Sequence, residues 1–213
     1  MNVDLIPCFQ SINILGWKDF VVPQAKSLFR EMEHGTKVLS VMGVNVPGTF
    51  VGTAPDAAYW LLRCEDNLTE SLAEEDYWAA AVEFADSVGV DVISSSLGYH
   101  SFDSKDDNYS YAHLDGHTAL ISKTASMLAN KGIVLVNSAG NDGMGTWKKI
   151  NVPADAYDIL TVGAVTPDCR NAAFSSIGPT ADGRVKPDVM ALGSPTAVIT
   201  GRGTIIKDIG TSF

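Results

Sequence analysis

Apolar stretches of two kinds alternate along this sequence, and that alternation constrains the fold more than any other feature. Residues 74–89 (EEDYWAAAVEFADSVG) place apolar side chains at helical spacing and end in a glycine. Residues 90–98 (VDVISSSLG) then predict a β-rich apolar strand that runs into a serine-glycine loop. The pair recurs, because residues 117–132 predict a helix and residues 133–142 predict a buried strand followed by a polar loop.

Further segments extend this pattern: a short helix is predicted over 34–43, and strands over 57–64, 159–165 and 186–192. Strands separated by helices predict an α/β fold with three layers, a mostly parallel, doubly wound sheet with helices on both faces. No internal repeat or linker interrupts the chain, so residues 1–213 are interpreted as a single domain. Function in such sheets gathers at the carboxyl ends of strands, where residues 94–100 and 137–143 lie.

The charge of the chain argues against some classes of partner. Its formal net charge is −10 and its pI is near 4.7, and no basic cluster is present, so a nucleic-acid partner is not expected. No apolar run is long enough for a membrane span. Four acidic residues before and within 74–89 are expected to begin that helix, where the helix dipole favours negative charge: Glu70, Glu74, Glu75 and Asp76.

Three separate segments carry residues suited to nucleophilic catalysis. Gly210-Thr211-Ser212 presents a hydroxyl, which becomes a nucleophile only when a base removes its proton. His34 stands before a glycine at the start of a predicted helix and could act as that base. Asn141 lies on a glycine-flanked loop, where its amide could stabilise a developing oxyanion. The alternative for the last is an ordinary turn, since Asn-Asp-Gly favours turns.

Taken in order, seven segments strongly resemble the subtilisin-like serine proteases, the subtilases, and most of all their bacterial members. They are EHGTKVLSVMG, ISSSLGY, VNSAGNDG, NVPADAYDILTVGAV, FSSIGP, KPDVMALG and GTSF, and they extend from about Glu33 to Phe213. The resemblance implies a serine endopeptidase in which His34 is the general base and Ser212 the nucleophile that forms an acyl-enzyme. It also implies that Asn141 and the backbone N–H of Ser212 form the oxyanion hole.

The resemblance further implies a substrate-binding edge and the pocket for the residue before the scissile bond. Ser96, Leu97 and Gly98 would pair with the substrate backbone as an added strand. The pocket wall would comprise Ser138, Ala139 and Gly140, with Pro153 and Ala154 as a further part. The implied partner is a peptide or protein, and no cofactor is required. A structural calcium ion is compatible with the family but has no recognisable ligand loop here. The family suggests a secreted or cell-envelope location.

The sequence departs from the family pattern at both ends. A subtilase orients its histidine with an aspartate that closes an apolar strand in an Asp-x-Gly setting. Upstream of His34 only Asp4 and Asp19 occur, and neither has that glycine. Family members also continue from the serine into a long buried helix, whereas only Phe213 follows here. We therefore expect an incomplete catalytic domain, truncated at both ends, with an exposed apolar sheet face and weak or no proteolytic activity.

Other functions remain open at this stage. A non-catalytic module could hold an extended peptide on Ser96–Gly98 without cleaving it. His113, Asp115 and His117 could suit a metal ion, although Asp-Gly within HLDGH is more typical of a turn. Neither the G-x-S-x-G motif of α/β-hydrolases nor the G-x-G-x-x-G motif of a dinucleotide site is present.

Overall fold

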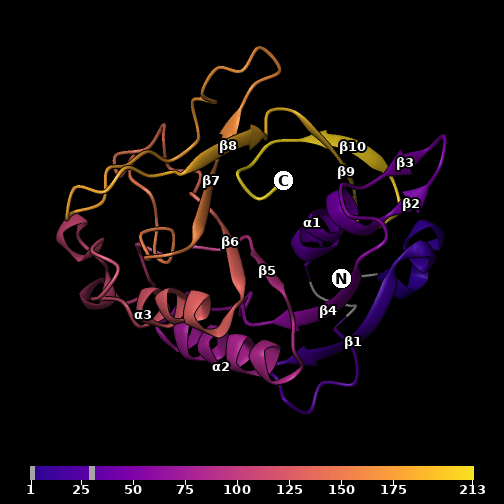
Figure 1. The fold of residues 1–213 in the computed structure, drawn as a ribbon, viewed down its shortest axis with the longest axis horizontal. Helices are drawn as coiled ribbons and strands as arrows, with labels where there is room; N and C mark the ends of the chain where they lie inside the picture. The colour runs from indigo at the N-terminus through magenta and orange to yellow at the C-terminus, as the bar shows by residue number, and fades with distance from the viewer. Residues whose placement is uncertain (1–2, 29–31) are drawn as a thin grey trace.

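A four-stranded parallel sheet lies at the centre of the computed structural model, which describes residues 3–28 and 32–213 (Figure 1). Its strands follow the order β5-β6-β7-β8, with β5 at Val92–Ser95, β6 at Val134–Ser138, β7 at Leu160–Val165 and β8 at Val189–Leu192. All three neighbouring pairs are parallel. These four strands were predicted from the sequence.

A second parallel pair joins β1 (Asn13–Asp19) to β4 (Ala58–Arg63). The sequence predicted β4 but not β1, because Gly16 and the polar ends of β1 interrupt its apolar pattern. Gly16 is required by packing, since a Cβ atom there would lie 2.4 Å from the ring of Trp60. Hydrogen bonds within the described residues therefore form two separate parallel ladders rather than one continuous sheet.

Two short antiparallel pairs were also not predicted. One pairs β2 (Asn45–Val46) with β3 (Phe50–Val51) directly after α1. The other pairs β9 (Thr196–Ile199) with β10 (Ile205–Asp208) shortly before the end of the chain. Neither pair was marked in the sequence by a continuous apolar run bounded by turn residues, as β5 to β8 were.

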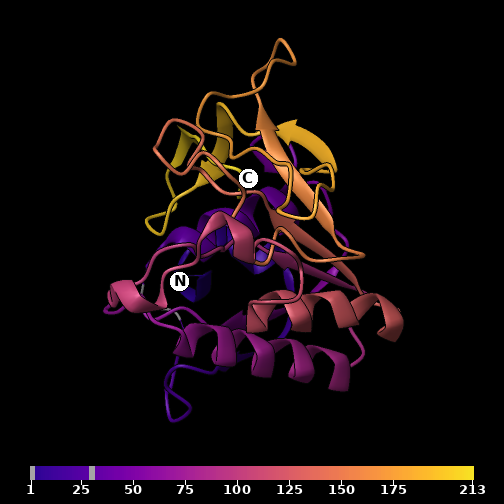
Figure 2. The ribbon, with the colours of Figure 1, turned by 90° about the vertical axis from the view of Figure 1, so that its left-hand side faces the viewer.

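Helices lie on both sides of the strands, as predicted. In Figures 1 and 2, α2 (Ala73–Ser87) and α3 (Leu120–Met127) lie side by side below the central strands, and α1 (His34–Gly43) lies on the other side of β4 and β5. Single 3-10 turns complete the described helices, at Val3–Leu5, Pro7–Ser11, Lys105–Asp107, Tyr111–His113 and Leu128–Lys131. None of the helices in the described ranges has the length and apolar character needed to cross a bilayer. The predicted α/β class is confirmed.

One core holds α2 and α3 against the central sheet. Trp78, Ala81 and Ala85 of α2, together with Ile121 of α3, are buried with Leu135 of β6 in a single apolar cluster. Burying large apolar side chains of this kind contributes about 1.5–3 kcal/mol each. The core therefore fixes the sheet face that lies toward these two helices.

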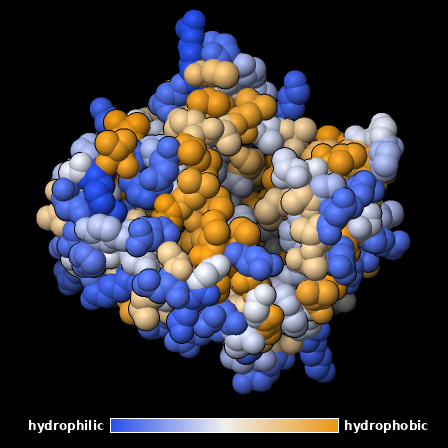
Figure 3. Space-filling view, viewed as in Figure 1, coloured by the Kyte–Doolittle hydropathy of each residue, from blue (hydrophilic) through white to orange (hydrophobic). Residues whose placement is uncertain are grey.

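The opposite face of the same sheet is exposed and apolar. Val92, Val134, Leu160 and Val189 are each 37–57% exposed, and Val92 pairs directly with Val134 across the ladder. In Figure 3 an apolar band runs over the central strands as seen in the orientation of Figure 1. The predicted exposure of one apolar sheet face is thus confirmed for the described residues.

Glu74, in the first turn of α2, makes the free energy of unfolding depend on pH. Only 2% of this residue is exposed, and burial raises the pKa of its carboxyl from an ordinary value near 4.5 to about 7. The folded protein therefore holds this proton to higher pH than the unfolded chain, so stability falls as the pH rises from about 4.5 to about 7. Replacing Glu74 by glutamine should reduce this fall by about 1–3 kcal/mol in urea unfolding measured at pH 5 and pH 7.5.

The exposed Glu83 on the same helix provides the control for this prediction. Glu83→Gln should leave the pH dependence unchanged. A Glu74→Gln protein whose stability changes with pH as much as that of the unmodified chain would contradict the assignment.

Candidate active site

His34 is the first residue of α1 and lies at the rim of two adjoining cavities. Burial lowers the pKa of its imidazole, the nearby Lys37 ammonium lowers it further, and the carboxylate of Asp208 opposes both. The imidazole is therefore neutral, and able to accept a proton, at a lower pH than an exposed histidine. Its ring meets that of Phe213 edge to face, with the centroids 6.2 Å apart.

Ser212 lies beside the loop that follows β5. Its hydroxyl donates to the carbonyl oxygen of Ser96 across a long 3.5 Å, and the hydroxyl of Ser96 donates to the carbonyl oxygen of Ser212 at 3.2 Å. These two contacts join residues 116 positions apart in sequence. They hold the Ser212 backbone against the predicted substrate-binding edge, and they direct its hydroxyl toward Ser96 in this structure.

Asn141 is fixed by the residue that precedes Ser212. The backbone N–H of Thr211 donates to its Oδ1 at 2.9 Å and the Thr211 hydroxyl donates at 3.1 Å. Because the carbonyl end of the amide is held in this way, the NH₂ end is directed away from Thr211. Asn141 lines the same two cavities as His34.

Gly140 gives the loop after β6 the shape that presents Asn141. Its φ of +109° is a conformation that other residues rarely adopt, and a Cβ atom would lie 2.8 Å from the Ser176 hydroxyl. Its N–H donates to the Thr211 hydroxyl at 3.3 Å. The loop is therefore shaped by glycine and tied to the segment that carries Ser212.

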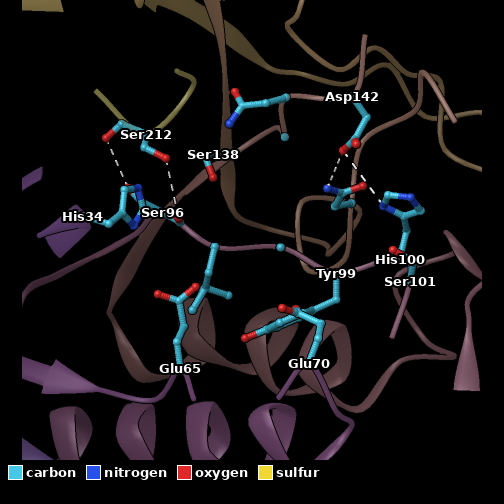
Figure 4. A pocket seen from close by; sticks show the side chains of 15 residues that line it. His34, Glu65, Glu70, Ser96, Tyr99, His100, Ser101, Ser138, Asp142 and Ser212 are labelled. Atoms are coloured by element: carbon cyan, nitrogen blue, oxygen red, sulfur yellow. Dashed lines mark hydrogen bonds and ion pairs between the residues drawn. The ribbon is translucent and has the colours of Figure 1, made fainter. Parts of the chain in front are cut away.

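One of these cavities, of about 410 Å³, brings most of the predicted site residues together. His34, Asn141 and Ser212 all line it, as do five of the eight predicted substrate-binding residues: Ser96, Leu97, Gly98, Ser138 and Gly140. Figure 4 shows Ser138 and Ser212 on one side of the Ser96 segment. The remaining three, Ala139, Pro153 and Ala154, are buried and do not line this cavity. They lie behind its surface, with the Ala139 carbonyl accepting the Asn151 N–H and the Asn151 carbonyl accepting the Ala154 N–H.

Neither upstream aspartate lies against His34. Asp19 ends β1 with its carboxylate bound by the Arg63 guanidinium at 3.0 Å and by the N–H groups of Val21 and Val22. Asp4 is exposed in the first 3-10 turn. In the part of the chain that the structure describes, no hydrogen bond or ion pair joins either carboxylate to the imidazole.

Asp208, at the end of β10, was not singled out from the sequence but lines the second cavity, of about 450 Å³, together with His34. Its carboxylate accepts from Lys37 Nζ at 3.0 Å, and Lys37 and the backbone N–H of Ile209 lower the pKa of this carboxyl. Lys37 also pairs with Glu33 at 3.0 Å. Among the described residues, the charges of Lys37 and Asp208 that act on His34 thus belong to one cluster of ion pairs, in which Lys37 also pairs with Glu33.

Sequence reasoning also missed part of the cavity lining. Glu65 and Glu70 contribute carboxylates to it, and Tyr99 and Asp142 lie on it as well. The carboxyl-end rule for parallel strands could have found Glu65, because this residue follows β4 by two positions. Glu70 precedes α2, so it does not belong to the first turn of the helix as the sequence suggested.

The polar side chains of residues 113–117 (HLDGH) make hydrogen bonds and a ring contact with other residues of the protein, which accounts for them without a metal ion. The Asp115 carboxylate accepts the backbone N–H groups of His117 and Thr118 and the Thr118 hydroxyl, as expected of a turn. His113 Nδ1 accepts the Ser110 N–H, and the His117 ring stacks on Tyr157. No group of three potential metal ligands occurs within the described ranges.

The fold is shared with proteases of known structure. The protease PagA, a prenylagaramide maturation protease, matches with a TM-score of 0.71 and 22% identity over 100% of this chain and 67% of that one. The patellamide maturation protease PatA matches with a TM-score of 0.71 and 23% identity over 98% of this chain and 68% of that one. At this level of identity the match establishes the fold.

Sequence comparison identifies the family. Subtilisin NAT of Bacillus subtilis subsp. natto is 28% identical over 95% of this chain, and subtilisin DY of Bacillus licheniformis is 32% identical over 68%. The chain spans about half the length of these relatives, 48% and 47% respectively. The family model Peptidase_S8, described as the subtilase family, matches residues 21–213. This chain therefore belongs to the subtilase family.

Proposed function

We propose that this chain carries the catalytic groups of a serine endopeptidase that hydrolyses peptide bonds through an acyl-enzyme on Ser212. The observation that supports it is the meeting of His34, Asn141 and Ser212, from three distant segments, around one cavity beside Ser96–Gly98. Membership of the subtilase family and a protease fold support the same function.

In the proposed reaction the Ser212 hydroxyl leaves the Ser96 carbonyl by rotation about χ1 and gives its proton to His34. The oxygen attacks the peptide carbonyl, and the Asn141 amide and the Ser212 N–H stabilise the negative charge on the carbonyl oxygen. His34 then returns its proton to the leaving amine, and water repeats the sequence to release the acyl group.

This chain is proposed to be a weak or inactive protease. Within residues 3–28 and 32–213 no aspartate is hydrogen-bonded to His34, so the imidazolium that forms in the transition state lacks a directly bound carboxylate, and in subtilisin loss of the triad aspartate lowers kcat by about 3 × 10⁴. A non-catalytic peptide-binding module is the second candidate. It is favoured by one observation, the contact that directs the Ser212 hydroxyl to Ser96 rather than to the imidazole.

A fluorophosphonate, which reacts with activated serines, distinguishes these two functions. The purified chain is expected to gain one adduct slowly, located at Ser212 by intact mass and peptide mapping, and Ser212→Ala should gain none. Labelling at a different serine in a folded chain would contradict the proposal. A folded chain that binds peptide but never reacts would support the binding module.

The lowered pKa of His34 gives the labelling a defined pH dependence. The neutral imidazole is the active base, so the rate should fall as pH decreases, with its midpoint below 6.5. Removing the Lys37 charge in Lys37→Gln should raise that midpoint, because this ammonium lowers the pKa of His34. Lys123→Gln, an exposed change on α3, serves as the control. A midpoint above 6.5 in the unmodified chain would contradict the assignment.

A further inference from the structure

A slot opens beside Ser212 where β5 and β6 stop pairing. The ladder between these strands ends at Ser95 and Asn137, and the chain continues as Ser96–Gly98 on one side of the slot and Ser138–Gly140 on the other. Residues of both segments line the 410 Å³ cavity. Because the first segment is hydrogen-bonded to the Ser212 carbonyl at 3.2 Å, the slot is the space next to a peptide carbonyl that this serine would attack.

Asn151 places its side chain across this slot. A Cβ atom added to Gly98 would lie 3.0 Å from Asn151 Cβ, and one added to Gly140 would lie 3.0 Å from Asn151 Nδ2. The side chain therefore extends from one glycine backbone to the other and occupies the space that the two glycines leave. Only 7% of Asn151 is exposed although the residue lines the cavity, so its amide forms a floor for the slot.

Hydrogen bonds hold this floor at both ends. The backbone N–H of Asn151 donates to the Ala139 carbonyl at 3.3 Å, and its side-chain Nδ2 donates to the Asp142 carboxylate at 2.9 Å. The backbone N–H of Asp142 donates in turn to the Ser176 hydroxyl at 3.0 Å. In Figure 4, Asp142 lies at the other end of the cavity from Ser212. The amide is thus fixed in place rather than free to rotate out of the slot.

We propose that Asn151 selects the substrate, by admitting only the small side chain of glycine, alanine or serine at the residue before the scissile bond. The carbonyl of that residue must reach Ser212, so its side chain lies at the mouth of the slot. A methyl group needs little depth there. A leucine or phenylalanine side chain would need the space that Asn151 fills, and adding carbons to a filled space forces its neighbours apart.

This inference rests on the proposed function, because it requires a peptide carbonyl at Ser212. It goes beyond that function in naming the class of substrate: chains with a small residue at the bond to be cleaved. It also assigns a role to a residue that no motif in the sequence singled out. Asn151 acts here through its volume and its fixed position, and not as a catalytic group.

Product-like peptides test the inference without depending on catalysis. The probes are fluorescein-labelled tetrapeptides that end in alanine, leucine or phenylalanine, so that the last residue is the one that precedes the cleaved bond. Binding to the full Ser212→Ala chain is followed by fluorescence anisotropy. The alanine peptide should bind at least as tightly as the other two. The added change Asn151→Gly should tighten the leucine and phenylalanine peptides by about tenfold or more, because it frees space in which they bury apolar surface, and should leave the alanine peptide nearly unchanged.

Two further variants keep this test independent of a loss of folding. Asn151→Ala retains the Cβ atom that packs against Gly98 and removes only the amide, so it should tighten the leucine peptide in the same direction but by less. Asn130→Gly is the matched control, because Asn130 is exposed in the 3-10 turn Leu128–Lys131, outside the cavity. This variant should leave all three affinities unchanged.

The possible outcomes separate this inference from the proposed catalysis. Tighter binding of leucine or phenylalanine than of alanine while Asn151 is present, an order of affinities that Asn151→Gly and Asn151→Ala both leave unchanged, or no binding of any peptide would overturn the inference. The expected change in preference without fluorophosphonate labelling would leave the role of Asn151 standing and contradict the proposed catalysis. Labelling of Ser212 without that change would do the reverse.

Discussion

Replacing His34 by alanine is expected to lower the rate of fluorophosphonate labelling at Ser212 by about 10²-fold. A general base typically contributes 10²–10⁴ in rate. We expect the lower end of this range because the residues of a triad act as a unit, so a histidine without its aspartate contributes less to the rate. In subtilisin, removing histidine costs about 2 × 10⁶ in kcat and removing aspartate alone about 3 × 10⁴, so about 10² is left for a histidine that acts without aspartate.

The control for this change is His113→Ala, because His113 lies outside both cavities and its Nδ1 only accepts a local backbone N–H. Labelling of this variant should match that of the unmodified chain. If His34→Ala labels Ser212 at the unmodified rate while remaining folded, the serine reacts without a base, and the proposed catalytic arrangement is wrong. A loss near 10⁶ would instead mean that a carboxylate orients His34 in solution.

The central sheet was predictable because its strands carry their own signals. The strands β5 to β8 are apolar and are bounded by glycine, proline or polar loops, and α2 and α3 show clear helical spacing. By contrast, β1 depends on tertiary contact. Its Gly16 packs under the ring of Trp60, 44 positions away, which no local pattern reveals. The formation of the short strand pairs β2–β3 and β9–β10 likewise depends on tertiary contacts with neighbouring elements rather than on a local sequence pattern.

Ordered motifs in the sequence singled out His34, Asn141 and Ser212, and the structure brings these three residues to one cavity. What the sequence could not give is the direction of each side chain. The Ser212 hydroxyl contacts Ser96, and Asp19 is occupied by Arg63. The sequence also does not reveal that Ala139 and Ala154 are buried behind the surface of the cavity. Glu65 and Glu70 carry no motif, and only the folding of two loops brings them together.

Replacing Asn141 by alanine is expected to lower the labelling rate by about 10²–10³-fold, the usual cost of one oxyanion donor. The phosphonyl oxygen gains negative charge as Ser212 attacks. Loss of the amide donor should therefore raise the free energy of the transition state more than it weakens binding of the ground state. Affinity for a peptide, measured on Ser212→Ala with and without the change, should therefore alter by much less than the labelling rate. Equal losses in rate and affinity would make Asn141 a binding residue rather than an oxyanion donor.

Asn141→Asp separates the donor from the structural role of this side chain. An aspartate keeps an oxygen for the Thr211 N–H and hydroxyl, which the amide accepts at 2.9 and 3.1 Å, but it replaces the NH₂ donor by a negative charge. If the NH₂ group stabilises the oxyanion, Asn141→Asp should label at least as slowly as Asn141→Ala although its loop is better held. If Asn141 only anchors the segment that carries Ser212, Asn141→Asp should recover most of the rate that alanine loses. The order of these two variants thus decides whether the loop shaped by Gly140 serves the chemistry of Ser212 or only its position.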